Sequence, residues 1–295
     1  MECWLSSEEA RNSGNYPVVT LDLFDKVYHL ELDDEVLEKE SKSVDKYKRY
    51  INELLELKPS DHRKFLKIIK AIEIRDNQYL EDGNRFLVEY YQESRKVNSI
   101  DYLIKHGKES LDANKLVKAH KIVLDGCLNG TNRIYRRLDN SNYVGRIDEN
   151  RERVISYFPI DARDIDQATN DFLHFYNSKY FDEHLLLKPQ IIHGLIATAQ
   201  IFEDGNTRLA RTLKNVKLYD LTTLEYPYEL ENPVIYGTTS YFEHRDEYRS
   251  LIRDIADRND DEVWNNWFKF NLERFDESLM HLKRNKQEFE KVLRR

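Results

Sequence analysis

The chain has 295 residues, of which 40% are hydrophobic and 12% aromatic, with only 9 glycines and 6 prolines. This length and composition exclude an intrinsically disordered protein and favour packed helices over a loop-rich fold. The formal net charge of -8 excludes wholesale nucleic-acid binding, because neutralising many phosphates requires a basic surface.

The cysteines and the hydropathy pattern predict a cytoplasmic protein. Cys3 and Cys127 lie far apart and fit no zinc-binding spacing, so we expect reduced thiols. No apolar run approaches the ~18 residues needed to span a bilayer. The opening residues, MECWLSSEEARNSGNY, lack the basic and apolar regions of a signal peptide. We expect no membrane partner, and the pattern indicates no particular oligomeric state.

The first half of the chain predicts an arm followed by helices. Residues 1 to about 30 contain Gly14, Pro17 and the alternating stretch VVTLDLF, which predict an irregular arm with one strand. Charges then interleave with apolar residues at helical spacing, and Ser60 and Asp61 suit a helix start. The predicted helices cover residues 33–57, 60–77, 84–95, 99–105 and 112–124.

The segment 133–159 has a different pattern from its surroundings. Its β-branched and aromatic residues flank the polar stretch DENRER, as expected for a β-hairpin or extended flap. Helices are predicted again beyond it, the last of them long, with an aromatic face that includes Trp264, Trp267 and Phe268. These helices cover residues 165–176, 189–198, 207–219, 242–258 and the C-terminal stretch.

The segment QIFEDGNTRLAR, residues 200–211, lies between two predicted helices. A Gly- and Asn-rich loop that opens a helix exposes backbone N–H groups, and the helix dipole adds positive potential there. Gly205 allows close backbone approach, and Asn206 can fix the turn with its side chain. The loop therefore predicts an anion site.

Charged side chains extend this anion site. Arg208 and Arg211 lie three residues apart, so both guanidinium groups could face bound phosphates, and Asp204 at the rim suits a shared Mg²⁺. The same letters also fit an ordinary turn followed by a solvated helix face, and the residues alone leave both interpretations open.

The segment resembles the Fic-family signature, H-x-F-x-D/E-G-N-G-R-x-x-R. The matching positions are Phe202, Asp204, Gly205, Asn206, Arg208 and Arg211. Several other stretches resemble the family between about residues 60 and 280: LVKAHKIVLDG, IYRR with the hairpin, YFPIDARDI and NPVIYGTTSYFEHRDEYRSLI. The resemblance implies a mainly α fold, in which a Fic (Fido) helical core carries a β-hairpin flap and additional N- and C-terminal helices.

The resemblance also implies how the chain is divided. We expect an N-terminal arm and helical region over residues 1–110, and a Fic core with flap and signature loop over 111–225. A C-terminal helical region would cover 226–295.

Fic proteins generally bind ATP and transfer its AMP moiety to a protein hydroxyl, which is AMPylation. By resemblance, Asp204 would hold Mg²⁺, and the arginines Arg208 and Arg211 would contact the outer phosphates. The nucleotide-phosphate cradle would be formed by Gly205, Asn206 and Thr207. A protein target would bind the flap, about Asn142 to Tyr157, by strand addition, and adenine would meet the region Tyr236 to Tyr241.

Two positions depart from the signature. Gln200 stands where the family has its base histidine, and a neutral amide cannot accept the proton of a target hydroxyl. Thr207 replaces the last glycine and adds a β-branched side chain at the cradle. His193, seven residues before Gln200, is expected to be a buried structural histidine. These departures predict a degenerate active site, as in a pseudoenzyme, with nucleotide binding retained.

Three alternatives therefore stay open. The chain could bind nucleotide without AMP transfer, could be an active transferase that uses another base or donor, or could be a non-enzymatic interaction or regulatory module. Many Fic proteins also have an inhibitory helix, and the nearest match, NQYLED, offers Glu81 as a partner for Arg211. The richness in Lys, Asn, Asp and Ile is typical of a bacterium with an AT-rich genome.

Overall fold

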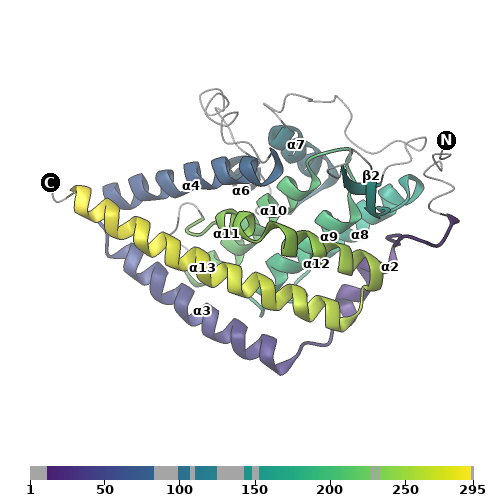
Figure 1. The fold of residues 1–295 in the computed structure, drawn as a ribbon. Coiled ribbons are helices and arrows are strands. Elements are labelled where there is room, and N and C mark those ends of the chain that lie inside the picture. The colour runs from purple at the N-terminus through teal and green to yellow at the C-terminus, as the bar shows by residue number, and fades with distance from the viewer. Residues whose placement is uncertain are drawn as a thin grey trace.

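The computed structural model describes residues 12–82, 99–106, 110–124, 143–147, 153–226, 230 and 233–293 (Figure 1). The predicted helix 84–95, both cysteines and the tip of the predicted flap lie outside the described residues. The fold class is confirmed, since helices dominate and the named strands form one two-stranded sheet within the described chain.

The elements follow the predicted order. Before the flap lie α2 (Asp22–Lys26), η1 (Val27–His29), α3 (Asp34–Leu55), α4 (Pro59–Asp82), α6 (Ser99–His106) and α7 (Ala113–Leu124). The flap is the antiparallel pair β1 (Val144–Ile147) and β2 (Arg153–Tyr157). After it come η3 (Ala162–Asp164), α8 (Ile165–Asn177), α9 (Leu187–Ala199), α10 (Asn206–Glu225), α11 (Thr238–Glu243), α12 (Arg245–Arg258) and α13 (Asp261–Leu293).

The long helix α13 lies along α3, so segments from opposite ends of the chain pack side by side (Figure 1). Tyr47 of α3 is buried and meets the Phe275 ring edge-on at a centroid distance of 5.4 Å. Lys39 forms an ion pair with Glu273 at 2.5 Å on the outer side of this contact. The amphipathic pattern of both helices thus produces an apolar seam with a charged rim.

Helix α9 is the central element of the core. All of its residues, Leu187–Ala199, are buried, and it packs against α10, which follows it in the chain. The Glu40 carboxylate of α3 accepts the backbone N–H groups of Leu186 and Leu187, at 3.0 and 3.2 Å. An acidic side chain at a helix N-terminus satisfies groups that have no partner within the helix. The start of α9 is therefore fixed by the N-terminal region.

Two predicted elements need correction. The stretch VVTLDLF is not a strand: Val18 makes an isolated parallel bridge with Phe158, and α2 begins at Asp22. Consecutive Leu23 and Phe24 are both buried, which a helix on the core permits and a half-buried strand does not. The predicted helix 242–258 is interrupted at His244, where the backbone leaves the helical region and α12 begins.

Within the described ranges, no helix combines the length and the apolar character that crossing a bilayer requires.

Candidate functional site

The loop between α9 and α10 is shaped by two residues in the left-handed backbone region. Gln200, which follows the last residue of α9, has φ 51 and ψ 52, and Gly205, which precedes α10, has φ 75 and ψ 9. These reversals let the chain leave one buried helix and enter the next within a few residues. The first turn of α10 has no side-chain cap at Gly205, so its N-terminus keeps the character of an anion site.

Asn206 closes the loop with its side chain. Its Oδ1 accepts the Phe202 N–H at 2.9 Å, and its Nδ2 donates to the Phe202 carbonyl, also at 2.9 Å. The same Nδ2 donates to Gln200 Oε1 at 2.9 Å. The predicted role of Asn206 in fixing the turn is consistent with this geometry, because its amide links both sides of the loop.

The Gln200 amide belongs to this network. While its oxygen accepts from Asn206, its Nε2 donates to the Ala197 carbonyl at 2.6 Å. Gln200 thus joins the last turn of α9 to the first residue of α10. A carboxamide in this setting acts as donor and acceptor but has no useful basicity.

Gly205 is required both by its backbone conformation and by its surroundings. A Cβ on Gly205 would lie 2.8 Å from Leu124 Cδ2 and 3.6 Å from His120 Nε2, both on α7. The loop therefore sits directly on α7, with no space for a side chain between them.

Asp204 and Arg208 form the charged rim. Asp204 Oδ1 accepts the Gly205 N–H at 2.6 Å, and its Oδ2 lies 3.4 Å from Arg208 Nη2. The Asp204 side chain is 61% exposed, whereas that of Arg208 is 8% exposed. An open carboxylate beside a mostly enclosed guanidinium suits a metal ion shared with a phosphate, because Mg²⁺ is usually held by one or two carboxylates plus substrate phosphates. Among the described residues, no group of three or more His, Cys, Asp or Glu side chains could hold a metal.

Arg211 occupies a different environment from Arg208. It is fully buried, and its charge contributes to lowering the pKa of His193 and of Lys214, although burial is the main cause for both. Both arginines are therefore buried, but Arg208 reaches the exposed Asp204 carboxylate whereas Arg211 lies deeper in the interior. The contact of Arg211 with an outer phosphate stays a prediction.

His193 lies in an aromatic core. Its Nε2 is 2.9 Å from the Tyr248 hydroxyl, and its ring contacts Tyr241 and Trp267. Burial, followed by the charges of Lys214 and Arg211, holds its pKa well below the usual value. These contacts are those of the structural histidine that the sequence predicts.

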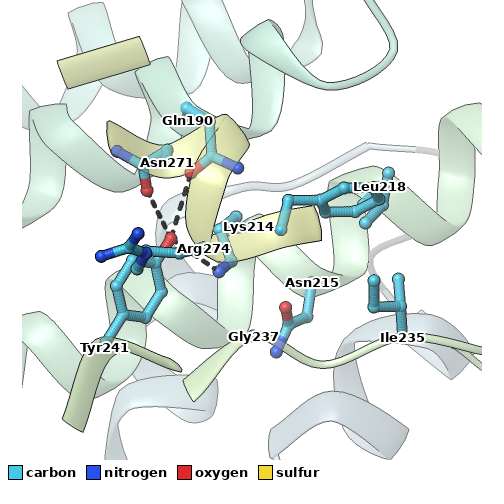
Figure 2. Close-up of a pocket in the computed structure, with 10 residues that line it drawn as sticks. Gln190, Lys214, Asn215, Leu218, Ile235, Gly237, Tyr241, Asn271 and Arg274 are labelled. Carbon is cyan, nitrogen blue, oxygen red and sulfur yellow. Dashed lines mark hydrogen bonds between the residues drawn. The ribbon is translucent and has the colours of Figure 1, made fainter. Parts of the chain in front are cut away.

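A buried polar cluster lies between α10, the helix that carries Arg208 and Arg211, and the helices packed against it (Figure 2). No sequence pattern had indicated this cluster. Lys214 donates to the Tyr241 hydroxyl at 3.1 Å, and this hydroxyl also meets Gln190 and Asn271. The adjoining cavity has a volume of about 10 Å³, enough for about one water molecule, so an adenine ring would not fit there.

Glu73 of α4 connects this region to the N-terminal helices. Its carboxylate accepts three hydrogen bonds. One comes from Asn215 Nδ2 at 3.0 Å, and two come from Thr238, through Oγ1 at 2.5 Å and the backbone N–H at 3.2 Å. Burial raises the pKa of Glu73, an effect that these hydrogen bonds and Lys214 oppose.

The remaining candidates are only partly described. The side chain of Glu81, at the end of α4, lies outside the described residues, so its pairing with Arg211 stays a prediction. The flap is a hairpin as predicted, described over residues 143–147 and 153–157. Thr207 lies in the first turn of α10 and is partly buried.

Comparisons with known proteins agree with this architecture. The model of the Fic/DOC family matches residues 110–218. No curated protein matches the chain.

Solved structures of Fic proteins share the fold at low sequence identity. Fic-1 (residues 134–508) from C. elegans matches with a TM-score of 0.55 and 11% identity, covering 84% of this chain and 71% of its own. A Fic family protein from Desulfovibrio desulfuricans has a TM-score of 0.55 and 17% identity, covering 87% and 76%. A Fic domain containing signaling protein from Bacteroides thetaiotaomicron has a TM-score of 0.50 and 14% identity, covering 83% and 97%. Residues 110–218 therefore match the Fic/DOC family model, within a chain that has the fold of Fic-domain proteins.

Proposed function

We propose that this protein binds ATP with Mg²⁺ at the loop before α10 and that its ability to transfer AMP is impaired. The observation that carries the proposal is the arrangement of the loop: an uncapped helix N-terminus at Gly205, with Asp204 exposed beside Arg208. Backbone N–H groups at such a helix start bind phosphate, and a neighbouring guanidinium adds a charge-assisted hydrogen bond.

Gln200 accounts for the impaired transfer. A general base must accept the proton of the attacking hydroxyl, and losing one typically costs about 10² to 10⁴ in rate. The Gln200 amide has no basic nitrogen, and both of its ends are hydrogen-bonded, to Ala197 in the last turn of α9 and to Asn206 at the start of α10. His193 is no substitute, because it is buried among aromatic side chains and bonded to Tyr248.

The same site suggests where regulation and partners would act. A protein segment would add to the flap strands as a further strand. Glu81 would pair with Arg211 as an inhibitory contact, which places the regulator on α4, the helix that Glu73 anchors to α10.

Calorimetric titration with ATP and Mg²⁺ tests nucleotide binding. Saturable binding is expected for the unchanged protein, and Arg208→Ala should weaken it about tenfold or more, the loss expected when a charged hydrogen bond is removed. Arg253→Ala, which removes an exposed arginine on α12, is the matched control and should leave the affinity unchanged. Equal affinities for all three proteins would contradict the proposed site.

A second candidate function is a latent or differently activated AMP transferase. The assembled rim of Asp204 and Arg208 favours it, because a pure scaffold has no need of a charged phosphate site. Gln200→His, alone and with Thr207→Gly, should then produce AMP-labelled protein when incubated with labelled ATP and Mg²⁺. If the double variant binds ATP and still labels nothing, impairment extends beyond the missing base.

A further inference from the structure

His120 of α7 contacts the signature loop through a hydrogen bond and through its ring. Its Nε2 lies 2.7 Å from the Asp204 carbonyl oxygen. Its ring stacks on Phe202 at a centroid distance of 3.9 Å and an interplanar angle of 10°. His120 is fully buried, so these contacts form a closed interface between α7 and the loop.

The partner atoms define which nitrogen holds the proton. A carbonyl oxygen only accepts hydrogen bonds, so Nε2 must carry a hydrogen and donate it to Asp204. Nδ1 is buried and has no hydrogen-bond partner among the described residues.

This nitrogen, which has no partner in the part of the chain that the structure describes, argues against a packing role alone. Leaving a buried polar atom without a partner costs about 1–3 kcal/mol, a cost that a phenylalanine ring at this position would avoid while keeping the stack on Phe202. What histidine adds over phenylalanine is the N–H that reaches the Asp204 carbonyl.

That carbonyl lies at the centre of the site. It belongs to the peptide unit that joins Asp204 to Gly205, whose N–H in turn donates to Asp204 Oδ1 at 2.6 Å. Holding this peptide plane fixes both the N–H that binds the carboxylate and the start of the left-handed turn at Gly205. A contact that holds this peptide plane therefore bears on the direction in which the exposed Asp204 carboxylate points.

We propose that His120 is a positioning residue of the nucleotide site, which holds the Asp204–Gly205 peptide so that the Asp204 carboxylate faces a phosphate-bound Mg²⁺. The proposal rests on the proposed ATP-binding function, and it concerns the part of binding that depends on the metal. His120 touches neither nucleotide nor metal in this role and acts through Asp204.

The test separates the donated hydrogen bond from packing. His120→Phe keeps the stacked ring and removes the donor, whereas Leu116→Ala disturbs the packing of the same helix one turn earlier, at another fully buried position. ATP affinity is measured for each variant with Mg²⁺ and with EDTA. We expect His120→Phe to weaken binding with Mg²⁺ about tenfold, the effect of one lost buried hydrogen bond, and to change binding in EDTA little.

Leu116→Ala is expected to lower the melting temperature. It should leave the ratio of the ATP affinity with Mg²⁺ to the ATP affinity in EDTA unchanged. A ratio for His120→Phe equal to that of the unchanged protein would overturn the proposal, because the metal-dependent part of binding would then not need the donor.

If the unchanged protein binds no ATP, the proposed function fails, but the role of His120 can still be tested. Hydrogen exchange of the loop amides provides that test, because it reports whether His120 holds the loop. Exchange at residues 203–206 should be about tenfold faster in His120→Phe and close to unchanged in Leu116→Ala, measured where both are folded. Unchanged loop exchange in His120→Phe would show that the peptide is held without His120 and would sink the inference.

Discussion

Gly205 is the residue on which the shape of the site depends most directly. Gly205→Ala would place a methyl group 2.8 Å from Leu124 Cδ2 in a backbone conformation that L-residues rarely adopt. We expect a loss of about 2 kcal/mol in the free energy of unfolding, combining left-handed strain with overpacking. Chemical denaturation measures it.

Gly14 supplies the matched control for this substitution. It has φ 70, close to that of Gly205, but no atom lies within 4 Å of its hypothetical Cβ. Gly14→Ala therefore imposes similar strain without overlap and should cost less than Gly205→Ala. Equal losses would mean that contact with α7 contributes nothing.

The sequence predicted the contacts between residues that are neighbours in the chain. Asp204, Gly205 and Asn206 are brought together by local turn chemistry, so their spacing was informative. His120 reaches Asp204 and Glu73 reaches Asn215 from other helices, across 84 and 142 residues of chain. No periodicity in one sequence encodes such contacts, which is why both were missed.

Among the elements, α9 depends on a carboxylate supplied by α3. Glu40 accepts two backbone N–H groups at the start of α9 and also lies 2.7 Å from His184 Nδ1. The hydrogen bond to Glu40 raises the pKa of His184 above its usual value, against the opposing effect of burial. The cap of α9 is thus linked to a titrating histidine.

This link gives the stability a pH dependence of defined sign. Because the folded protein holds the His184 proton more tightly than the unfolded chain, the contribution is complete below pH ~6.5 and is lost as pH rises through the raised pKa. Melting temperatures measured from about pH 6 to pH 8 should include this decline. Glu40→Gln keeps an acceptor for Leu186 and Leu187 but removes the charge, so it should flatten this part of the profile. An unchanged slope in Glu40→Gln would refute the link.

Helical periodicity predicted most elements, with errors where packing decides. The helices α3, α8 and α10 follow from apolar spacing, and their bounds differ from the prediction by a few residues. The break at His244 lies between two helices that both contact α13 but otherwise pack on different neighbours, α11 on α4 and α12 on α9. The amphipathic pattern continues through the break, so it does not indicate that the chain changes its packing neighbours there.

At the scale of the whole molecule, regions distant in sequence converge behind the signature helix. Lys214 from α10, Tyr241 from α11 and Asn271 from α13 meet in one buried polar cluster (Figure 2). Glu73 from α4 joins this cluster through its electrostatic interaction with Lys214 and its hydrogen bond to Thr238 of α11. Buried polar groups need mutual partners, so these helices must dock together for any of them to be satisfied. The division into 1–110, 111–225 and 226–295 stays a prediction, and this cluster joins elements from all three regions.

Lys214 makes the cluster sensitive to alkaline pH. Burial lowers its pKa to about 8, assisted by the Arg211 charge and opposed by Glu73. In the unfolded chain a lysine keeps its proton to about pH 10.4, so between the two values the unfolded state binds more protons than the folded state. The free energy of unfolding should therefore gain up to about 1.4 kcal/mol per pH unit from this residue as pH rises from about 8.

Lys214→Met removes the titrating group while keeping an unbranched side chain, so the variant should lack this gain. Urea denaturation at pH 7.5 and pH 9.5 measures the difference, and Lys118→Met, at an exposed position of α7, is the control that should behave like the unchanged protein. Lys214→Met also removes the cation beside Glu73, which changes the free energy of unfolding at every pH. The quantity to compare among the proteins is therefore the change in the free energy of unfolding between pH 7.5 and pH 9.5. The same slope in all three proteins would mean that Lys214 keeps its ordinary affinity for its proton, and that the cluster tolerates a full positive charge at the centre of the molecule.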